Sequence, residues 1–308
     1  MSTLPKFIVS SVVRGSIQGD SHGGVYLVDM KAHAFEQVVN WNTCEIDFAG
    51  RGADRGLRGI LIIGDEIYLA ASDELFVFNR RFDITASYRN AYLRHCHEIC
   101  LHRGKMYLTS TGFDSILRFD LATKTFDLGF ALRRAPGGIT AATFDPASSS
   151  GPPPALEFHI NNVYADDTGI YISGRGLPAL MHISANRLQP AAPLPLGTHN
   201  ARPYRGGVLF NDTESDCLAW MTPGRRIAIP VPSYDAAKLI STGLDESGLA
   251  RQAFGRGLCP VTDNLIAAGS SPTTIALHDL EAGRCVDSFA LTMDVRNAAH
   301  GLAIWPFG

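Results

Sequence analysis

The sequence predicts an all-β fold, because short apolar strands and tight polar turns recur along it in one repeating register. Five segments read as hairpins whose second strands align without a gap; these strands begin at Ile67, Met106, Ile170, Val208 and Leu265. Turns rich in Gly, Asp and Asn between such strands are typical of antiparallel hairpins. Repetition at about 40–50 residues, with several short strands in each repeat, is the sequence signature of a β-propeller.

A polar or cationic residue stands nine positions before each of these second strands. These residues are Arg58, His97, Asn161, His199 and Arg256, and His300, in the C-terminal sequence His-Gly-Leu, supplies a sixth copy. Each begins an otherwise apolar strand, and burial of unpaired polar groups is costly. We therefore expect these six side chains, called the ring residues below, to face a shared site on the axis of a six-bladed propeller.

The strands of the blades can be followed in order. Residues 7–13, 24–30 and 35–41 predict three N-terminal strands with no inner strand before them, and the four-strand pattern then repeats from residue 59 and again from residue 98. The C-terminal segment 298–306 predicts an inner strand without partners after it. Joined, the two ends make one complete blade, and such closure leaves no free sheet edge.

Two of the repeats are longer than the others. Residues 133–155 are rich in Gly, Pro and Ser and predict a loop insertion, and residues 232–254 predict a second insertion with one helical turn. Without these segments every repeat is close to about 40 residues, the length of a blade. The sequence thus predicts a single β-propeller domain over residues 1–308.

Composition and charge argue against several classes of protein. Of the 308 residues, 45% are hydrophobic and 19% are charged, which favours a large core over a disordered chain. The net charge is −3 and no Lys/Arg tract occurs, so neither nucleic acid nor a membrane surface is an expected partner. No apolar stretch approaches the length of a membrane span, and the N-terminus does not resemble a secretory signal. Six scattered cysteines fit reduced thiols, and the sequence therefore predicts a cytoplasmic protein.

Three histidines, His97, His199 and His300, alternate with the other ring residues. On a six-fold ring they form a triangle about the axis, and three neutral imidazoles with open positions make a catalytic metal site. His95 and His159 each lie two residues before a ring position and share its strand face. We expect His159 to be a fourth ligand or an acid/base; whether His95 is a ligand or supports one stays open.

The remaining polar residues near the ring predict substrate contacts. Glu98 and Asn162 occupy the position after a ring residue, where a side chain can orient ligands or act as a base. Guanidinium groups bind carboxylate or phosphate, so Arg58 and Arg256, with Asn161, are expected to hold an anionic substrate. Arg202 and Arg175 are further candidates of this kind. Structural salt bridging to a neighbouring blade is the alternative role for these arginines.

The segments His97-Glu98-Ile99, His159-Ile160-Asn161-Asn162, His199-Asn200-Ala201-Arg202 and Arg256-Gly257-Leu258 resemble a group of bacterial conserved hypothetical β-propeller proteins. In that group similar short motifs recur in the same order, and the likeness covers most of residues 55–280. The group brings no settled activity, so the resemblance supports the site, His159 included, and not a reaction. The predicted architecture is also similar to oligogalacturonate lyases and gluconolactonases, although the latter use oxygen ligands where this chain offers imidazoles.

The sequence therefore predicts a metalloenzyme that acts on a small, anionic molecule. Imidazole ligands without thiolates fit Zn²⁺, Fe²⁺, Cu²⁺ or Mn²⁺, and ligand chemistry does not choose among them. It also does not choose between a hydrolase, a lyase and an oxygenase. The alternatives are a non-catalytic propeller that binds a protein, and a metal-free receptor for an anion. The oligomeric state is not predicted.

Overall fold

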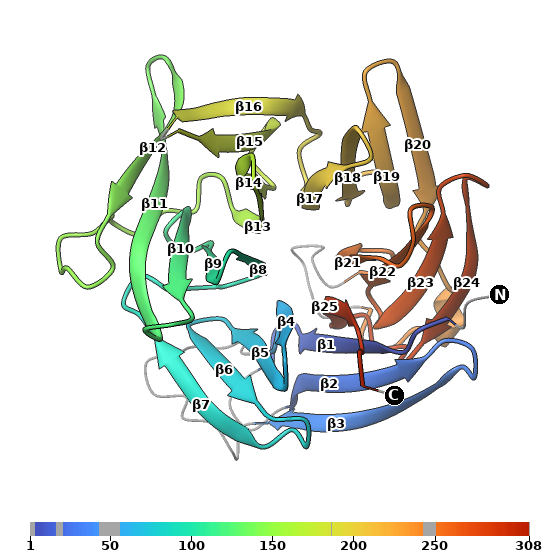
Figure 1. The fold of residues 1–308 in the computed structure, drawn as a ribbon. Coiled ribbons are helices and arrows are strands. Elements are labelled where there is room, and N and C mark those ends of the chain that lie inside the picture. The colour runs from blue at the N-terminus through green and yellow to red at the C-terminus, as the bar shows by residue number, and fades with distance from the viewer. Residues whose placement is uncertain (1–3, 17–20, 43–55, 186, 243–250, 308) are drawn as a thin grey trace. The chain divides into compact units, whose positions relative to one another are not determined.

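The computed structural model describes residues 4–16, 21–42, 56–185, 187–242 and 251–307. These residues form six antiparallel sheets, five with four strands and one with five (Figure 1). In five of the sheets neighbouring strands are consecutive in sequence, and in the sixth β25 lies beside β1. The chain is a six-bladed β-propeller, as the repeating hairpins predict. Within the described residues, no helix has the length and apolar character that crossing a membrane requires.

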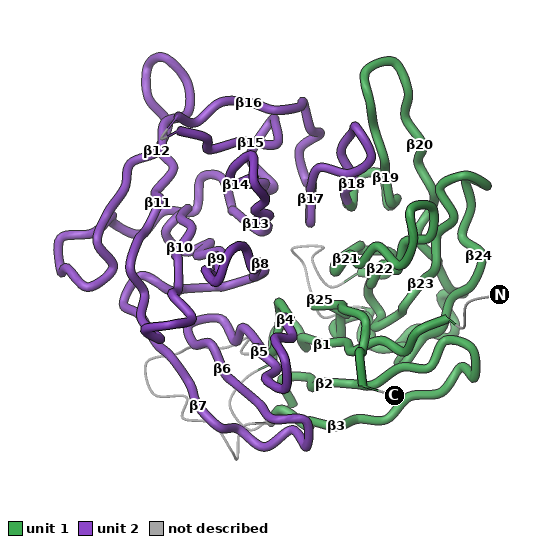
Figure 2. Tube along the Cα trace, viewed as in Figure 1, with its two compact units in different colours: residues 1–60, 211–308 green, residues 61–210 purple. Residues whose placement is uncertain are grey.

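The chain divides into two compact units (Figure 2), which are described separately here. Unit 1 comprises residues 1–60 and 211–308, and unit 2 comprises residues 61–210. This division into units does not test the expected single domain, which stays a prediction.

Three blades belong to unit 2, apart from the first residue of β4. The first contains β4 (Ile60–Ile63), β5 (Glu66–Ala71), β6 (Glu74–Phe78) and β7 (Ile84–Arg89). The second contains β8 (Ile99–His102), β9 (Lys105–Ser110), β10 (Ser115–Asp120), β11 (Thr125–Ala135) and β12 (Gly138–Phe144). The third contains β13 (Ile160–Asp166), β14 (Gly169–Gly174), β15 (Ala179–Ser184) and β16 (Arg187–Pro193).

Two blades belong to unit 1. One contains β21 (Arg256–Pro260), β22 (Leu265–Ser270), β23 (Thr274–Asp279) and β24 (Arg284–Ala290). The other has the order β25-β1-β2-β3 and contains β25 (Asn297–Ile304), β1 (Phe7–Val13), β2 (Ser21–Asp29) and β3 (Ala34–Asn42). In it β25 pairs with β1, which confirms that strands from the two ends of the chain share one blade. The remaining blade, β17 (Thr198–Tyr204), β18 (Gly207–Asp212), β19 (Cys217–Thr222) and β20 (Arg225–Pro230), contributes strands to both units.

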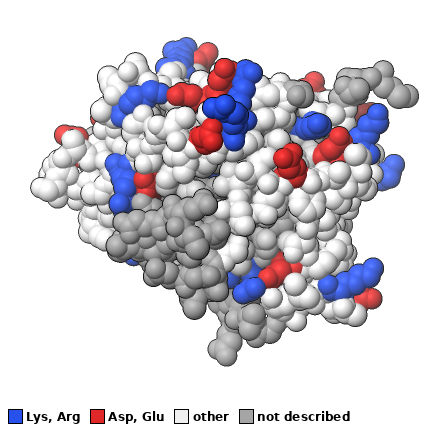
Figure 3. Space-filling view, turned by 90° about the horizontal axis from the view of Figure 1, so that it is seen from below, with Lys and Arg blue, Asp and Glu red and all other residues white. Residues whose placement is uncertain are grey.

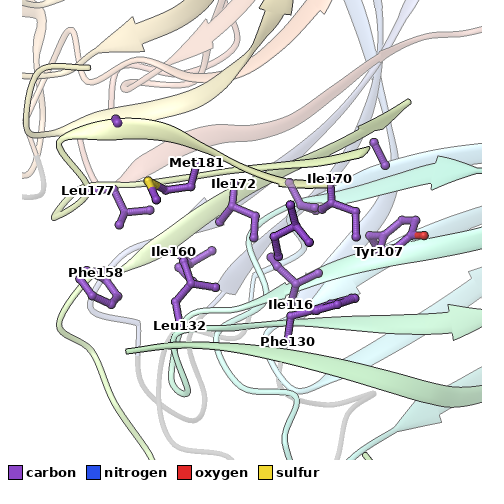
Figure 4. Packing of buried hydrophobic residues seen from close by; sticks show 14 residues of the cluster. Tyr107, Ile116, Phe130, Leu132, Phe158, Ile160, Ile170, Ile172, Leu177 and Met181 are labelled. Carbon is purple, nitrogen blue, oxygen red and sulfur yellow. The ribbon is translucent and has the colours of Figure 1, made fainter. Parts of the chain in front are cut away.

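Burial follows the position of a strand in its blade. Strands β1 and β6 are buried along their whole length, whereas the outer strands β7 and β16 alternate between exposed and half-buried residues. In unit 2 the apolar faces of the second and third blades pack together, and Ile116, Leu132, Phe158, Ile160 and Ile172 are fully buried there (Figure 4). This core lies directly beneath the start of β13, the strand that carries Asn161.

The first predicted insertion is partly wrong. Residues 133–144 were expected to be loop, but they complete β11 and form β12, whose residues pair from Gly129↔Phe144 to Ala135↔Gly138. The Pro136-Gly137 pair makes the turn, and the apolar and β-branched residues after it form an edge strand. Gly129 leaves the space that the Phe144 ring occupies, since a Cβ at Gly129 would overlap that ring. Residues 145–155 form no named strand.

The second predicted insertion has one short helical element. A single 3₁₀ turn covers Ala236–Lys238, with Asp235 accepting a hydrogen bond from the amide of Ala237 (3.0 Å). This matches the expected helical turn, while residues 243–250 of the insertion lie outside the described residues.

Acidic and basic side chains are interspersed on the molecular face shown in Figure 3. Ion pairs such as Arg118 with Asp127 (2.8 Å) join the two signs at the surface. This mixture accords with the small net charge of −3. The prediction that nucleic acid and membranes are not partners stays a prediction.

Candidate functional site

All six ring residues are buried, each between 1% and 8% exposed. They lie at or within two residues of the start of an inner strand, apart from His300, which is the fourth residue of β25. Unit 2 holds His97, Asn161 and His199, and unit 1 holds Arg58, Arg256 and His300. The sequence register therefore identifies structurally related positions, three in each unit.

A β-bulge recurs at the ring register. The pairing of β13 with β14 shifts between Ile160 and Asn162, and that of β21 with β22 shifts between Arg256 and Leu258. In the terminal blade the pairing of β1 with β25 shifts where Ser10 meets the two residues His300 and Gly301. Such bulges redirect side chains and are common beside active sites. A bulge of this kind explains how a polar side chain can point away from the apolar face of the strand that carries it.

In unit 2 the imidazoles of His97 and His199 are held in the same tautomer by the same device. Nδ1 of His97 lies 2.7 Å from the carbonyl oxygen of His95, and Nδ1 of His199 lies 3.0 Å from that of Gly197. A carbonyl oxygen only accepts, so each Nδ1 carries the proton and donates it. In the neutral rings Nε2 therefore keeps its lone pair. A fixed Nδ1–H is the arrangement that metal-ligating histidines use.

The backbone supplies these carbonyl groups through a left-handed residue two positions before each histidine. His95 has φ +54° and Gly197 has φ +81°. The hydroxyl of Thr111 adds a second contact to His97: it lies 2.9 Å from Nδ1 and donates to the carbonyl of Ile160 (2.5 Å). Thr111 thereby ties the imidazole of one blade to the inner strand of the next. Sequence reasoning missed Thr111, because nothing local marks a threonine that bonds across blades.

His159 also has a left-handed backbone, with φ +47°, and is half-buried. Its ring meets that of His97 edge to face, with centroids 5.3 Å apart and planes inclined at 69°. The preceding residue, Phe158, donates its amide to the carboxylate of Asp114 (3.0 Å), which is itself completely buried. Burial raises the pKa of the Asp114 carboxyl above its usual value, against the lowering effect of hydrogen bonds from backbone amides around His159. Asp114 thus fixes the segment that positions His159, and no local sequence pattern indicates this role.

Amide side chains connect the three inner strands of unit 2. Asn200 donates to Oε1 of Glu98 (2.8 Å), and Asn161 donates to the carbonyl of Thr198 (2.8 Å). Asn162 donates to the carbonyl of Ala201 (2.7 Å). The side-chain oxygen of Asn161, Oδ1, is buried and has no hydrogen-bond partner among the described residues. Glu98 is therefore oriented by Asn200, and Asn161 keeps one acceptor atom for a further partner.

Arg202 and Arg175 contact other residues of unit 2. The guanidinium of Arg202 lies over the ring of Tyr164, 4.3 Å from its centroid. The backbone amide of Arg175 donates to the carbonyl of His159 (3.3 Å). The roles predicted for both in substrate binding stay predictions.

In unit 1 two ring residues bond directly to each other. Nη1 of Arg256 donates to Nε2 of His300 (2.9 Å), and because a guanidinium only donates, His300 accepts there. Ligation of a metal by His300 through Nε2 would replace this hydrogen bond, whereas ligation through Nδ1 would not. The predicted role of His300 as a metal ligand stays a prediction.

Close backbone approach explains the small residue that follows several ring residues in unit 1. A Cβ at Gly301 would overlap the carbonyl oxygen of Arg58, and one at Gly257 would lie 2.8 Å from that of His300. Ser10 fills the remaining gap, accepting from the amide of Gly301 (2.8 Å) and donating to the carbonyl of Arg58 (2.5 Å). Arg58, Arg256 and His300 are thus held on consecutive inner strands.

No group of three or more His, Cys, Asp and Glu side chains has the arrangement of a metal site within the described ranges. The argument for a metal therefore rests on the chemistry of the individual donor atoms. His97 and His199 present two Nε2 lone pairs with their tautomers fixed, as an imidazole-bound transition metal requires.

Comparison with known proteins shows the fold and nothing more specific. No protein-family model matches the chain, and no curated protein matches it. Similar solved structures include a chain of the nidogen/laminin complex (TM-score 0.61, 10% identity, 97% of each chain covered). A protein of unknown function from Bacteroides caccae is also similar (TM-score 0.55, 11% identity, covering 98% of this chain and 100% of that one). A third, apo AztD from Citrobacter koseri, has a TM-score of 0.50 at 11% identity and covers 94% of this chain and 83% of its own. At these identities the chain shares an architecture with the three proteins, and the family resemblance seen in its motifs stays a prediction.

Proposed function

We propose that this propeller binds a divalent transition metal through Nε2 of His97 and His199 and acts as an enzyme on a small, anionic molecule. The observation that carries the proposal is the shared tautomer lock, in which a left-handed residue two positions earlier offers its carbonyl oxygen to Nδ1. A histidine with only a structural role needs no such repetition in two blades. His159, whose ring contacts that of His97, is the third imidazole of the proposed site. The role expected for His300, which belongs to unit 1, stays a prediction.

The surrounding residues fit distinct chemical roles. A bound metal would polarise a substrate oxygen or lower the pKa of a water molecule. Glu98 is half-buried and held by Asn200, so it is placed to hold or accept a proton. The side-chain Oδ1 of Asn161 supplies an acceptor for a substrate hydroxyl or amine. Zn²⁺, Fe²⁺, Cu²⁺ and Mn²⁺ all suit this donor set, and hydrolysis, elimination and oxygenation are each compatible with it.

The test is the metal content of the purified protein by mass spectrometry, for the native chain and for the double variant His97→Ala/His199→Ala. His182→Ala is a matched control, because His182 is stacked on Tyr171 with a ring separation of 4.3 Å, well apart from the inner strands. We expect near-stoichiometric metal in the native protein and in the control, and its loss in the folded double variant. Absence of metal from all three, even after reconstitution with each of the four ions, would reject the metalloenzyme.

A role as a protein-interaction scaffold is the main alternative. The partly exposed ring of Phe35, 45% exposed, lies beside Phe289 on the outer strands of unit 1 and offers an aromatic contact for a protein partner. On this alternative the double histidine variant would lose no function beyond local stability, whereas Phe35→Ser would abolish binding. Metal analysis separates the two roles.

A further inference from the structure

Three arginines of unit 1 surround a single aromatic ring. The guanidinium carbon atoms of Arg14, Arg251 and Arg256 lie 4.9, 5.2 and 4.8 Å from the centroid of the Phe254 ring. Phe254 is buried, only 3% exposed, so the ring is a fixed platform. Cation–π contacts of this length are ordinary one at a time. Three on one ring concentrate positive charge in a small volume.

The cluster is built from three separate parts of the chain. Arg14 directly follows β1, and its amide donates to the carbonyl of Arg296 (2.9 Å). Arg251 precedes β21 and pairs with Asp216 (2.6 Å) while also donating to the carbonyl of Thr213. Arg256 begins β21 and donates to His300. The guanidinium groups of Arg251 and Arg256 are thus oriented by hydrogen bonds of their own, and Arg14 is anchored through its backbone, so that the three side chains meet at one formed site.

Phe254 holds a distinctive place in the register. It lies two residues before the ring residue Arg256, the position that histidines occupy before His97 and Asn161. The blade that contains β21 thus has an apolar ring at the position where those two blades have an imidazole. An apolar ring suits the stacking of guanidinium groups, as an imidazole suits metal ligation.

We propose that Arg14, Arg251, Arg256 and Phe254 form a binding site for an oxyanion of two or more negative charges, such as a phosphate group or a dicarboxylate. A guanidinium stacked on a ring directs its N–H groups outward in its own plane, where they meet oxygen acceptors in paired hydrogen bonds. An anion with several oxygens can accept from more than one of the three groups, in addition to the contacts that they already make. Chloride has no second acceptor atom and only one charge, so it cannot accept the paired hydrogen bonds that a guanidinium directs at two oxygen atoms, and it should bind more weakly.

The inference extends the anionic substrate of the proposed function but does not depend on the metal. Its only shared residue is Arg256, and the ligands of the proposed metal, His97 and His199, belong to unit 2. The measurements below are made in the presence of a chelator. Failure of the metal site and failure of the anion site are therefore distinguishable.

The test follows the thermal unfolding midpoint of the native chain as inorganic phosphate, malonate or chloride is added at constant ionic strength. A site filled well beyond its dissociation constant should raise the midpoint by about 3 °C, with saturation. We expect saturable stabilisation by phosphate or malonate and none by chloride. Whichever of phosphate and malonate stabilises at the lower concentration identifies the class of anion that the site prefers. In Arg14→Gln and Arg256→Gln the half-saturating concentration should increase at least tenfold.

A matched control is Arg225→Gln, since Arg225 lies over a different ring, that of Trp220, 5.7 Å from its centroid. This variant should respond to phosphate and malonate like the native chain. If the two cluster variants do not fold, the native chain decides the matter by itself. A native response that is not saturable, or is equal for chloride at the same ionic strength, overturns the proposal, and so does an equal loss of response in Arg225→Gln.

Discussion

His278 makes the stability of this protein sensitive to mild acid. It lies on β23, fully buried, opposite Ile266 and Cys285, and neither ring nitrogen has a hydrogen-bond partner among the described residues. Burial lowers the pKa of His278 from 6.5 to about 4. The facing thiol of Cys285 supplies no compensating charge, because burial raises its pKa. Protonation of the folded chain at His278 is thus strongly disfavoured.

The sign and size of the effect follow from these values. Between pH 6.5 and pH 4 the unfolded chain takes up a proton at His278 and the folded chain does not, so the free energy of unfolding falls as the pH falls. The neutral imidazole thereby contributes stability at pH 7.5 that is lost on acidification. The loss from this one residue is about 2.5 kcal/mol at pH 4.5 and approaches about 3 kcal/mol below pH 4.

The assay is urea unfolding of the native chain and of His278→Leu at pH 7.5 and pH 4.5. Leucine has nearly the same volume and no proton to bind, so the variant should lose about 2.5 kcal/mol less between the two pH values than the native chain. His182→Leu, which changes a half-buried histidine on β15, is the control and should keep the native dependence. If the native chain and His278→Leu lose equal stability on acidification, the reasoning from burial is wrong.

Three more substitutions test the site and its frame. Thr111→Val removes the hydroxyl beside Nδ1 of His97 and should weaken metal binding about tenfold or more, measured by competition with a chelator, while the fold persists by circular dichroism. His159→Gly should abolish or weaken metal binding with a stability change within about 1 kcal/mol, because glycine adopts the φ of +47° without strain; unchanged metal affinity would remove His159 from the ligands. Gly301→Ala should cost about 1–3 kcal/mol of unfolding free energy, since its Cβ would overlap a backbone carbonyl, whereas Gly137→Ala, with open space around it, should cost little; equal costs would contradict the close approach of the strands.

Much of the fold could be predicted because a blade is local. Each hairpin consists of neighbouring residues, so period-two alternation and turn chemistry reveal it directly, and the shared register of Asn161 and Arg256 reflects a bulge that recurs in their two blades. The fifth strand β12 escaped prediction because its polarity matches an edge strand and a loop equally well. Here pairing with β11 decided the conformation.

Candidate site residues could be named from the sequence only where they lie on the repeat. Asp114 and Thr111 act on the next blade along, and Arg14 reaches Phe254 from 240 positions earlier in the chain. Such contacts leave no pattern in a single sequence, because neither partner is unusual in its local segment. A repeat identifies which positions are equivalent, but the groups that orient them come from tertiary contacts.

The backbone at His159 argues most directly that this side chain has a chemical role. His95 and His159 both adopt a positive φ two residues before a ring position, where His199 has Gly197 instead. A left-handed conformation costs a residue with a side chain about 1 kcal/mol more than glycine. At position 95 the carbonyl oxygen serves the tautomer of His97, a task that any residue can perform. At position 159 the ring itself touches His97, and Asp114 holds the strained segment in place through a completely buried carboxylate. Strain that is maintained by a second costly group is typical of a functional site, so we expect the imidazole of His159 to have a chemical role.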